Sequence, residues 1–297
     1  MIKVLITGAN SFVGKNFRKF SKYKDIKEIS LYENKPEDID FSKYEVILHL
    51  AAIVHQSKKI RESEYFMVNK DLSLKVAELA KKAGIKQFVY LSTLKVHGGY
   101  IPGYAVRNEN SECYPEDAYG KSKYEAEIGL KKLENVDFTV SIIRPPLVYG
   151  EGVRANMLSL VKLIESFPLL PFGNIFNKRN FIYIENLVGF IDRIIEKRAS
   201  GVFIAKDEGC LSTTELVYYL SKYLDRKVTL FKLPKIFIRI YTYFRPDIFE
   251  RLFGSLEFDN SKTKKTLNYT PPYSSEEGIK KWLNNYKTAK RVDAKLL

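Results

Sequence analysis

Short apolar runs alternate with longer segments of helical periodicity along most of the chain. Runs rich in β-branched and other apolar residues predict strands, and apolar residues spaced three and four apart predict helices. The predicted strands are 4–6, 28–32, 46–50, 87–91, 138–143, 181–183 and 201–205. The predicted helices are 14–23, 65–83, 118–133, 157–165 and a segment ending near residue 197. This alternation predicts βαβ units and an α/β fold, a doubly wound parallel sheet with helices on both faces.

After Gly150 the pattern becomes less regular. Ser212 and Glu215 are spaced as a capping box that opens another helix. We therefore expect a sheet lobe made of residues 1–155 and about 181–205, and a smaller C-terminal α/β lobe made of about 156–180 and 206–297. The aromatic and basic segment 233–254 is expected to be a packed helix of the small lobe, with a membrane-surface helix as the alternative.

Composition narrows the class of protein. The 297 residues are 45% hydrophobic and include 19 Phe and 20 Tyr, enough for a large core, which excludes a disordered chain. Two cysteines and three histidines exclude a disulfide scaffold and a cysteine-rich zinc site, so no metal is expected. No apolar run is long enough to span a bilayer, and the N-terminus lacks a signal-peptide core, so we expect a cytoplasmic protein.

The net charge is 49 − 35 = +14. Such an excess favours phosphate-bearing ligands, nucleic acid or an anionic membrane surface. The lysines are scattered, so a solvated lysine-rich surface explains the charge equally well. The aromatic residues fall in apolar strand and helix patterns without a basic stacking motif, and we expect no nucleic-acid partner. Peripheral membrane contact is left open.

A phosphate-binding turn is predicted between the first strand and the first helix. The sequence ITGANSFVG has the pattern G-x-x-S-x-x-G, with Gly8 leaving the strand, Gly14 packing the helix on the sheet and Ser11 where a glycine is usual. Helix N-terminal amides would then face the pyrophosphate of a dinucleotide. About 20 residues on, Glu33 would bind the ribose hydroxyls and repel a 2′-phosphate, which favours NAD. Lys35 lies close by, and NADP remains an alternative.

A catalytic pair is predicted near the start of the helix 118–133. Tyr119 and Lys123 are four residues apart and share one helical face. A cationic Lys123 would lower the pKa of the Tyr119 phenol and let it exchange a proton with an alcohol or ketone. Ser92 and Thr93 supply hydroxyls where the fourth strand ends.

These motifs together resemble the extended short-chain dehydrogenases/reductases of the NAD-dependent epimerase/dehydratase family. The resemblance covers roughly residues 2–286 and rests on ITGANSFVG, HLAA, the asparagine of MVNKD, LSTLKVHG, AYGKSKYEAE, IIRPPLVYG and RNFIYIENL. It implies a Rossmann-type NAD(P)-binding lobe and a smaller nucleotide-sugar-binding lobe, with the boundaries given above.

The resemblance also implies roles for individual residues. Thr93, Tyr119 and Lys123 would be catalytic, with Tyr119 as the acid/base. The cofactor-binding residues would be Gly8, Ser11, Phe12, Val13, Gly14, Glu33, Leu50, Ala51, Ala52, Asn69, Ser92, Tyr119, Lys123 and Pro145. The substrate-binding residues would be Thr93, Lys95, Asn156, Arg179 and Arg251.

The implied activity is hydride transfer with NAD(P) at sugar C4 of a UDP-sugar, in surface polysaccharide biosynthesis. The chain resembles bacterial UDP-glucose 4-epimerase-like proteins and 4-keto-reductases of UDP-6-deoxy-N-acetylhexosamines. His97 replaces the tyrosine usual in epimerases, so the 4-keto-reductase is preferred, with a UDP-glucose or UDP-N-acetylglucosamine 4-epimerase as the alternative. A non-catalytic NAD(P)-binding regulator is a second alternative. A homodimer through the helices 65–83 and 118–133 is implied, while their lysine-rich surfaces keep a monomer open.

Overall fold

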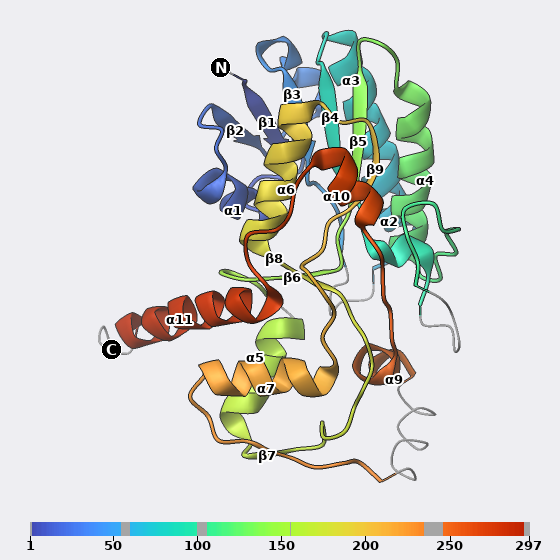
Figure 1. The fold of residues 1–297 in the computed structure, drawn as a ribbon. Helices are drawn as coiled ribbons and strands as arrows, with labels where there is room; N and C mark the ends of the chain where they lie inside the picture. Colours follow the sequence, from blue (N-terminus) through green and yellow to red (C-terminus); the bar gives the residue numbers. More distant parts are fainter. Residues whose placement is uncertain (1, 55–59, 100–105, 155, 235–245, 294–297) are drawn as a thin grey trace.

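A six-stranded parallel sheet forms the centre of the molecule (Figure 1). The structure is a computed structural model, and it describes residues 2–54, 60–99, 106–154, 156–234 and 246–293. The sheet order is β2-β1-β3-β4-β5-β9. The strands are β1 (Val4–Thr7), β2 (Ile26–Ile29), β3 (Val46–His49), β4 (Gln87–Leu91), β5 (Thr139–Arg144) and β9 (Gly201–Ile204). Every neighbouring pair is parallel, which confirms the expected Rossmann-type α/β architecture.

Successive side chains of each strand point to opposite faces of the sheet, and the side chains on both faces are buried in hydrophobic clusters. Leu5, Ile47 and Phe88 belong to one hydrophobic cluster, whereas Val4 and Val46 belong to the other. This double burial explains why the strands are continuous apolar runs in the sequence.

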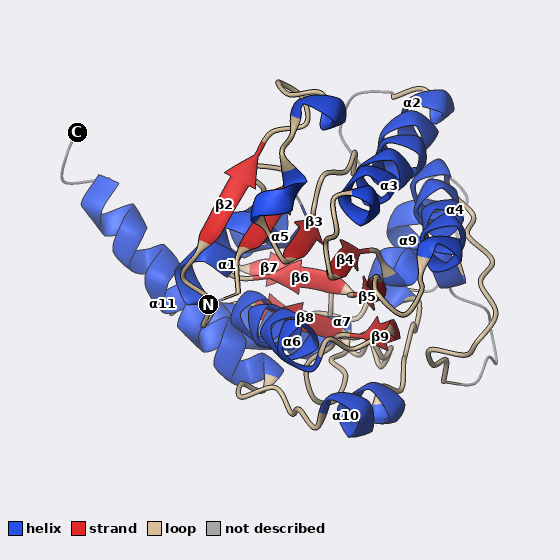
Figure 2. Ribbon diagram, turned by 90° about the horizontal axis from the view of Figure 1, so that it is seen from above, coloured by secondary structure: helices blue, strands red, loops and turns tan. Residues whose placement is uncertain are grey.

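Helices cover the two faces (Figure 2). On one face, α1 (Phe12–Phe20) packs against α6 (Ile184–Lys197). The opposite face carries α2 (Glu62–Phe66), a π-helical turn η3 (Met67–Leu72), α3 (Ser73–Lys82) and α4 (Ala118–Leu133). The expected helix 65–83 is thus one helical segment interrupted by a π turn. The short 3₁₀ helices η1 (Pro36–Asp38), η2 (Phe41–Lys43) and η4 (Leu94–His97) lie in the connections.

The strand order reverses at β1, which lies between β2 and β3. Ligands of open α/β sheets bind at the carboxyl ends of the strands beside such a switch point. The expected second strand, 28–32, was wrong at both ends. The chain turns after Ile29, where the amides of Glu33 and Asn34 donate to the Ser30 oxygen, and Tyr32 is fully exposed.

The remaining elements lie mostly at the carboxyl end of the sheet (Figure 1). They are α5 (Asn156–Ser166), α7 (Thr213–Tyr223), α9 (Pro246–Phe253), α10 (Ser261–Leu267), α11 (Ser275–Asp293) and the strand pairs β6 (Leu147–Tyr149) with β8 (Phe181–Tyr183) and β7 (Leu169–Leu170) with β10 (Thr229–Leu230). The Ser212–Glu215 capping box at α7 is confirmed. Helix α10 packs on α6 beside the sheet, and the boundaries of the two lobes stay a prediction.

Half of the aromatic and basic segment 233–254, residues 235–245, lies outside the described residues, and its last part forms α9. Within the part of the chain that the structure describes, no helix is long and apolar enough to cross a bilayer.

Candidate functional site

The turn after β1 has the shape that a bound diphosphate requires. Gly8 has φ +108°, and a Cβ added to it would lie 2.6 Å from the Ala51 amide nitrogen. A side chain is therefore excluded where the ends of β1 and β3 meet. Ser11 caps α1 by accepting from the Gly14 amide at 3.1 Å, which leaves its hydroxyl hydrogen free to donate. Helix geometry leaves the first-turn amides of α1 without an intrahelical acceptor.

The other wall of this cradle follows β3. Leu50 donates its amide to the Thr7 oxygen at 2.8 Å, so the segment of Leu50, Ala51 and Ala52 stays beside the turn. Asn69, in the π turn, fixes the end of this segment through hydrogen bonds with the Ile53 backbone. Its side chain accepts from the Ile53 amide at 2.8 Å and donates to the Ile53 oxygen at 3.0 Å.

Together the turn and this wall fit a dinucleotide, because the first-turn amides of α1, among them those of Phe12 and Val13, follow a turn in which only glycine fits against the chain after β3. Because the side chain of Asn69 is fully buried and already bonded, a direct contact with the cofactor stays a prediction.

The acidic residue expected beside the cofactor lies away from the strand end. Glu33 is exposed in the turn that follows β2, four residues beyond Ile29. A different carboxylate contacts the phosphate turn: Glu28, within β2, accepts from the Asn10 amide at 3.2 Å through Oε2. The other oxygen of Glu28, Oε1, is buried without a hydrogen-bond partner. The sequence spacing pointed to Glu33 because it placed the end of the strand three residues too late.

The predicted catalytic residues converge at the carboxyl end of β4. Thr93 follows this strand, and Tyr119 lies in the first turn of α4. Burial raises the pKa of Tyr119 to about 12, although its hydrogen bond with Thr93 acts in the other direction. The expectation that Tyr119 has a lowered pKa is thus wrong for the protein on its own, since desolvation of the phenolate outweighs the neighbouring donor.

Lys123 is directed at β4 and not at the phenol oxygen. Its Nζ donates to the Leu91 oxygen at 2.8 Å and lies 4.4 Å from the centre of the Tyr90 ring. The side chain is almost completely buried. Burial lowers the pKa of Lys123 to about 7, and the charge of Glu127 opposes this effect. The lysine is therefore close to the boundary between its charged and neutral forms at neutral pH.

Lys95 lies beside Tyr119, and its expected role in substrate binding stays a prediction. Its ammonium group forms an ion pair with Asp117 and lies 5.9 Å from the centre of the Tyr119 ring. Asp117 also caps α4 by accepting from the Gly120 amide at 2.7 Å. Sequence reasoning missed Asp117, although an aspartate directly before a helix is a recognisable N-cap signal.

Two residues expected at the cofactor face other partners. Ser92 is buried, and its hydroxyl donates to Glu127. Pro145, also buried, accepts the Leu94 amide at 3.0 Å through its backbone oxygen and so joins the ends of β4 and β5. Glu127 itself was not expected to take part in the site.

The expected substrate residues are spread over the carboxyl side of the molecule. Asn156 is exposed at the start of α5. Arg179 donates to the backbone oxygens of Glu250 and Gly254 at 3.0 and 3.1 Å, so it joins the segment before β8 to α9. Arg251 belongs to α9, and its side chain lies outside the described part of the structure. Their contacts with a substrate stay predictions.

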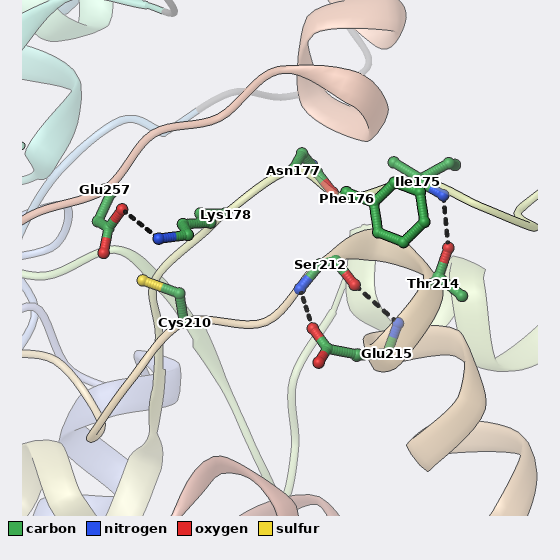
Figure 3. Close-up of a pocket in the computed structure, with 9 residues that line it drawn as sticks. All are labelled: Ile175, Phe176, Asn177, Lys178, Cys210, Ser212, Thr214, Glu215 and Glu257. Carbon is green, nitrogen blue, oxygen red and sulfur yellow. Dashed lines mark hydrogen bonds and ion pairs between the residues drawn. The ribbon is translucent and has the colours of Figure 1, made fainter. Parts of the chain in front are cut away.

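A surface pocket of about 470 Å³ lies near Arg179 but contains none of the expected residues (Figure 3). It is lined by Phe176, Lys178, Ser212, Glu215 and Glu257, among others. Its polar groups are paired with one another: Ser212 and Glu215 form the capping box, and Lys178 Nζ lies 3.6 Å from Glu257. Since these groups are already satisfied, we assign no chemistry to this pocket. No group of three His, Cys, Asp or Glu side chains suited to a metal ion occurs among the described residues.

Comparison with known proteins agrees with this geometry. The model of the NAD dependent epimerase/dehydratase family matches residues 4–204. A UDP-glucose 4-epimerase from Vibrio cholerae is 35% identical, and the alignment covers 93% of each chain. The N-acetyl-alpha-D-glucosaminyl-diphospho-ditrans,octacis-undecaprenol 4-epimerase of Escherichia coli O157:H7 is 28% identical over 78% of this chain and 75% of that protein.

Solved structures share the fold. A dTDP-4-dehydrorhamnose reductase from Clostridium acetobutylicum superposes with a TM-score of 0.78 at 20% identity, covering 96% of this chain and 100% of that one. A UDP-glucuronic acid 4-epimerase from Bacillus cereus, in complex with NAD, gives 0.75 at 20% identity, covering 97% and 99%. The chain is therefore an enzyme of the NAD dependent epimerase/dehydratase family, an extended short-chain dehydrogenase/reductase.

Proposed function

We propose that this enzyme is a UDP-hexose 4-epimerase that retains NAD between turnovers. The observation that carries the proposal is the 35% identity to the Vibrio cholerae UDP-glucose 4-epimerase over 93% of both chains, together with Thr93, Tyr119 and Lys123 at one strand end. The second relative, an epimerase of a lipid-linked sugar, supports the same reaction at C4. This reverses the order expected from the sequence, in which the 4-keto-reductase came first.

The environment of His97 supports this reversal. The sequence favoured a reductase over an epimerase because His97 stands where epimerases usually carry a tyrosine. The His97 ring is buried, with Nε2 2.9 Å from Arg144 Nη1 and Nδ1 3.2 Å from the Glu112 oxygen. A side chain engaged in this way does not require a change in the reaction at Thr93 and Tyr119.

Each catalytic residue has a role in this proposal. Bound NAD supplies the acceptor and donor of hydride at sugar C4. Tyr119 takes the proton from the C4 hydroxyl and returns it to the C4 oxygen after the sugar ring has turned. Thr93 holds that oxygen through a hydrogen bond. Lys123, as an ammonium ion, stabilises the phenolate form of Tyr119 once the site is closed to water. The cradle of Gly8, Ser11 and the start of α1 holds the diphosphate of the cofactor.

Cofactor choice and substrate contacts extend this proposal. The Glu33 carboxylate would accept hydrogen bonds from the ribose hydroxyls of NAD if the turn after β2 folds toward the cofactor. Asn156, Arg179 and Arg251 would hold the diphosphate of the UDP-sugar. A homodimer, peripheral membrane contact and the cytoplasmic location stay predictions.

The deciding experiment separates epimerase from reductase. Purified enzyme is first analysed for bound NAD, then incubated with UDP-glucose or UDP-N-acetylglucosamine, and the products are separated by chromatography. Formation of the C4 epimer without added cofactor is the expected result. Parallel samples hold UDP-4-keto-6-deoxy-N-acetylglucosamine with NADH or NADPH and are followed at 340 nm. Stoichiometric oxidation there, with no epimer in the first samples, would make the enzyme a 4-keto-reductase.

A further inference from the structure

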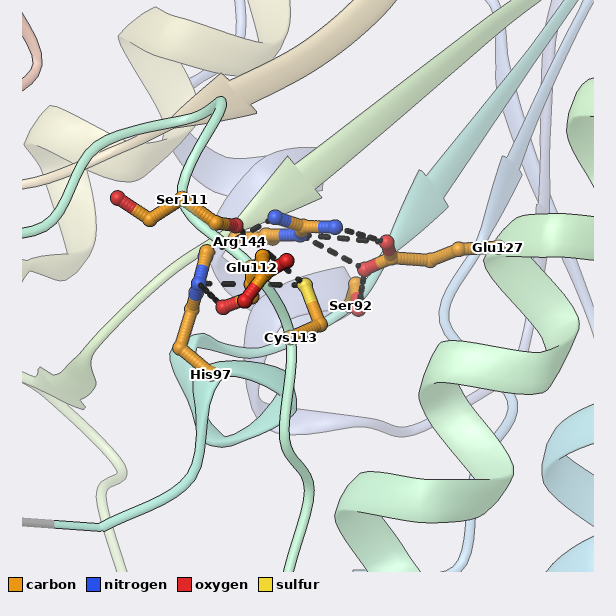
Figure 4. A network of polar contacts seen from close by, with 7 residues as sticks. All are labelled: Ser92, His97, Ser111, Glu112, Cys113, Glu127 and Arg144. Carbon is orange, nitrogen blue, oxygen red and sulfur yellow. Dashed lines mark hydrogen bonds and ion pairs between the residues drawn. The ribbon is translucent and has the colours of Figure 1, made fainter.

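A buried polar network begins at Ser92, the residue before Thr93, at the end of β4 (Figure 4). It joins four segments through Ser92 after β4, His97 in η4, Glu127 in α4 and Arg144 at the end of β5. Arg144 Nε lies 3.0 and 3.2 Å from the two carboxylate oxygens of Glu127, and Nη2 also bonds this carboxylate. Ser92 donates its hydroxyl to Glu127, and Arg144 Nη1 lies 2.9 Å from His97 Nε2.

The ion pair at the centre of this network is enclosed by the protein. The side chains of Arg144 and Glu127 are 3% and 0% exposed. Desolvating two charges is so unfavourable that apolar residues often replace such a pair without loss of stability. The pair is therefore weak evidence for a role in stability, and its location requires another explanation.

That location is next to the catalytic lysine. Glu127 follows Lys123 by one helical turn on the same face of α4, and both side chains are buried. Lys123 donates to the Leu91 oxygen, while Ser92, the next residue along the chain, donates to Glu127. The carboxylate and the ammonium group thus bond adjacent residues at the end of β4.

The other groups facing Lys123 carry no charge near neutral pH. Tyr90 of β4 and Tyr119 of α4 have pKa values raised mainly by burial. His49 of β3 has a pKa lowered to about 3 by burial and by the charge of Lys123. Glu127 is consequently the negative charge that acts on the lysine, and it raises the pKa of Lys123 against the effect of burial.

Three further titratable groups lie near the ion pair, together with the charged Arg107, which donates to the His97 backbone oxygen, and the charged Glu112. Burial raises the pKa of Cys113, in the loop before α4, and of Tyr124 in α4. Burial and the charge of Arg144 lower the pKa of His97 to about 4. A neutral His97 accepts from Arg144 at Nε2 and donates from Nδ1 to the Glu112 oxygen, which keeps the guanidinium turned toward Glu127.

We propose that Glu127, partly compensated by Arg144, keeps Lys123 an ammonium ion inside the closed site, and is thereby a positioning residue for the catalytic lysine. The inference rests on the proposed function for its meaning in catalysis. Its physical content, the charge of Lys123, does not depend on which sugar the enzyme converts.

The test follows the titration of Lys123 directly. Enzyme labelled with ¹³C-lysine is titrated by NMR between pH 5.5 and 10, and the Lys123 signal is assigned from its loss in Lys123→Met. Ordinary lysines titrate near pH 10.4, so a midpoint near 7 stands apart from theirs. Glu127→Gln is expected to move the midpoint down by about one pH unit, and Arg144→Met to move it up, because Glu127 is then uncompensated.

Opposite shifts separate this role from a structural one. Loss of either partner of a merely structural pair would destabilise the fold in both variants without opposite effects on Lys123. Glu125→Gln, which removes an exposed carboxylate of the same helix, is the matched control and should leave the midpoint in place. Equal midpoints in wild type, Glu127→Gln and Arg144→Met, or shifts in one direction, would overturn the proposal.

A double variant covers the case in which a single buried charge prevents folding. Glu127→Gln with Arg144→Met removes both charges, and a midpoint lower than in wild type is expected because the Glu127 charge raises the pKa of Lys123 even with Arg144 in place. An unchanged midpoint would count against the proposal.

In the activity assay, the alkaline limb of the kcat profile should move to lower pH in Glu127→Gln, with the KM for the UDP-sugar within about twofold of wild type. A wild type inactive on UDP-hexoses would refute the proposed function and leave the NMR result to decide this inference.

Discussion

Lys123 donates from Nζ to the backbone oxygen of Leu91 at 2.8 Å, which fixes its amino group against the last residue of β4. The same strand end carries Thr93, so the lysine and the threonine are held by one short segment of chain. This hydrogen bond does not compensate the lost hydration, because burial still lowers the pKa of Lys123 to about 7. The site thus contains a charge that the proposed mechanism requires and that burial disfavours.

Replacing this lysine should stabilise the protein and abolish its activity. Lys123→Met removes a buried ammonium group, and we expect the free energy of unfolding at pH 7 to rise by about 1–2 kcal/mol while turnover falls at least about 10²-fold. The folded pKa lies below the unfolded one, so wild-type stability increases as pH rises from about 7 toward 10.5. The gain should therefore shrink at high pH, measured by urea unfolding at several pH values. A variant that is less stable than wild type at pH 7 would contradict this, and the exposed Lys121→Met is the control.

Removing the phenol oxygen tests the assignment of the acid/base. Tyr119→Phe should lower kcat by about 10²-fold or more, because the phenol oxygen, which is hydrogen-bonded to Thr93, is the group that exchanges the proton in the proposed mechanism. Bound NAD and the thermal midpoint should stay close to wild type. The measurement is product chromatography with UDP-glucose, and Tyr218→Phe, on the exposed face of α7, is the control. Near-wild-type turnover would exclude Tyr119 as the acid/base.

The pattern of apolar residues was sufficient to predict most of the sheet. The segments 87–91, 118–133 and 181–183 match β4, α4 and β8 residue for residue, because each has clear boundaries in turn or capping residues. The second strand was misplaced because Leu31 and Tyr32 extend an apolar run into a turn. The spacing of apolar residues does not show where a strand stops pairing with the neighbouring strand.

The candidate catalytic residues could be proposed from the sequence, but their electrostatic environment could not. Tyr119 and Lys123 are recognisable because they are four residues apart on one helix. Glu127 and Arg144 are 17 residues apart and meet because α4 packs on β5, so their pairing depends on the tertiary structure. The pKa of Tyr119 depends on burial, which also follows only from the packed fold.

Two buried histidines should make the protein sensitive to acid. Burial lowers the pKa of His49 to about 3 and that of His97 to about 4. As pH falls below about 6.5, the unfolded chain binds protons that the folded protein does not, so stability decreases until the folded pKa values are reached. The His97→Asn variant lacks one of the two histidines that bind these protons in the unfolded chain.

The measurement is the difference in pH dependence between wild type and His97→Asn. Between pH 6 and 4.5 the unfolding free energy of the variant should fall less steeply, by about 1.4 kcal/mol per pH unit for one proton. Carboxylates contribute equally to both proteins and cancel in the comparison. Parallel curves would mean that His97 is already protonated in the folded protein or that its folded and unfolded pKa values are equal.

The close approach at Gly8 can be separated from backbone strain by a matched pair of variants. Gly8 and Gly84 both have positive φ, +108° and +82°, but a Cβ at Gly8 would lie 2.6 Å from the Ala51 amide, whereas Gly84 has open space. Gly84→Ala should therefore lower stability by about 1 kcal/mol, the strain of the backbone alone. Gly8→Ala should lower stability further and reduce NAD affinity at least tenfold, because the end of β3 must move away from the phosphate turn. Fluorescence titration with NAD and urea unfolding measure both effects. If Gly8→Ala binds NAD as tightly as Gly84→Ala, the contact between the ends of β1 and β3 is not what shapes the cofactor cradle.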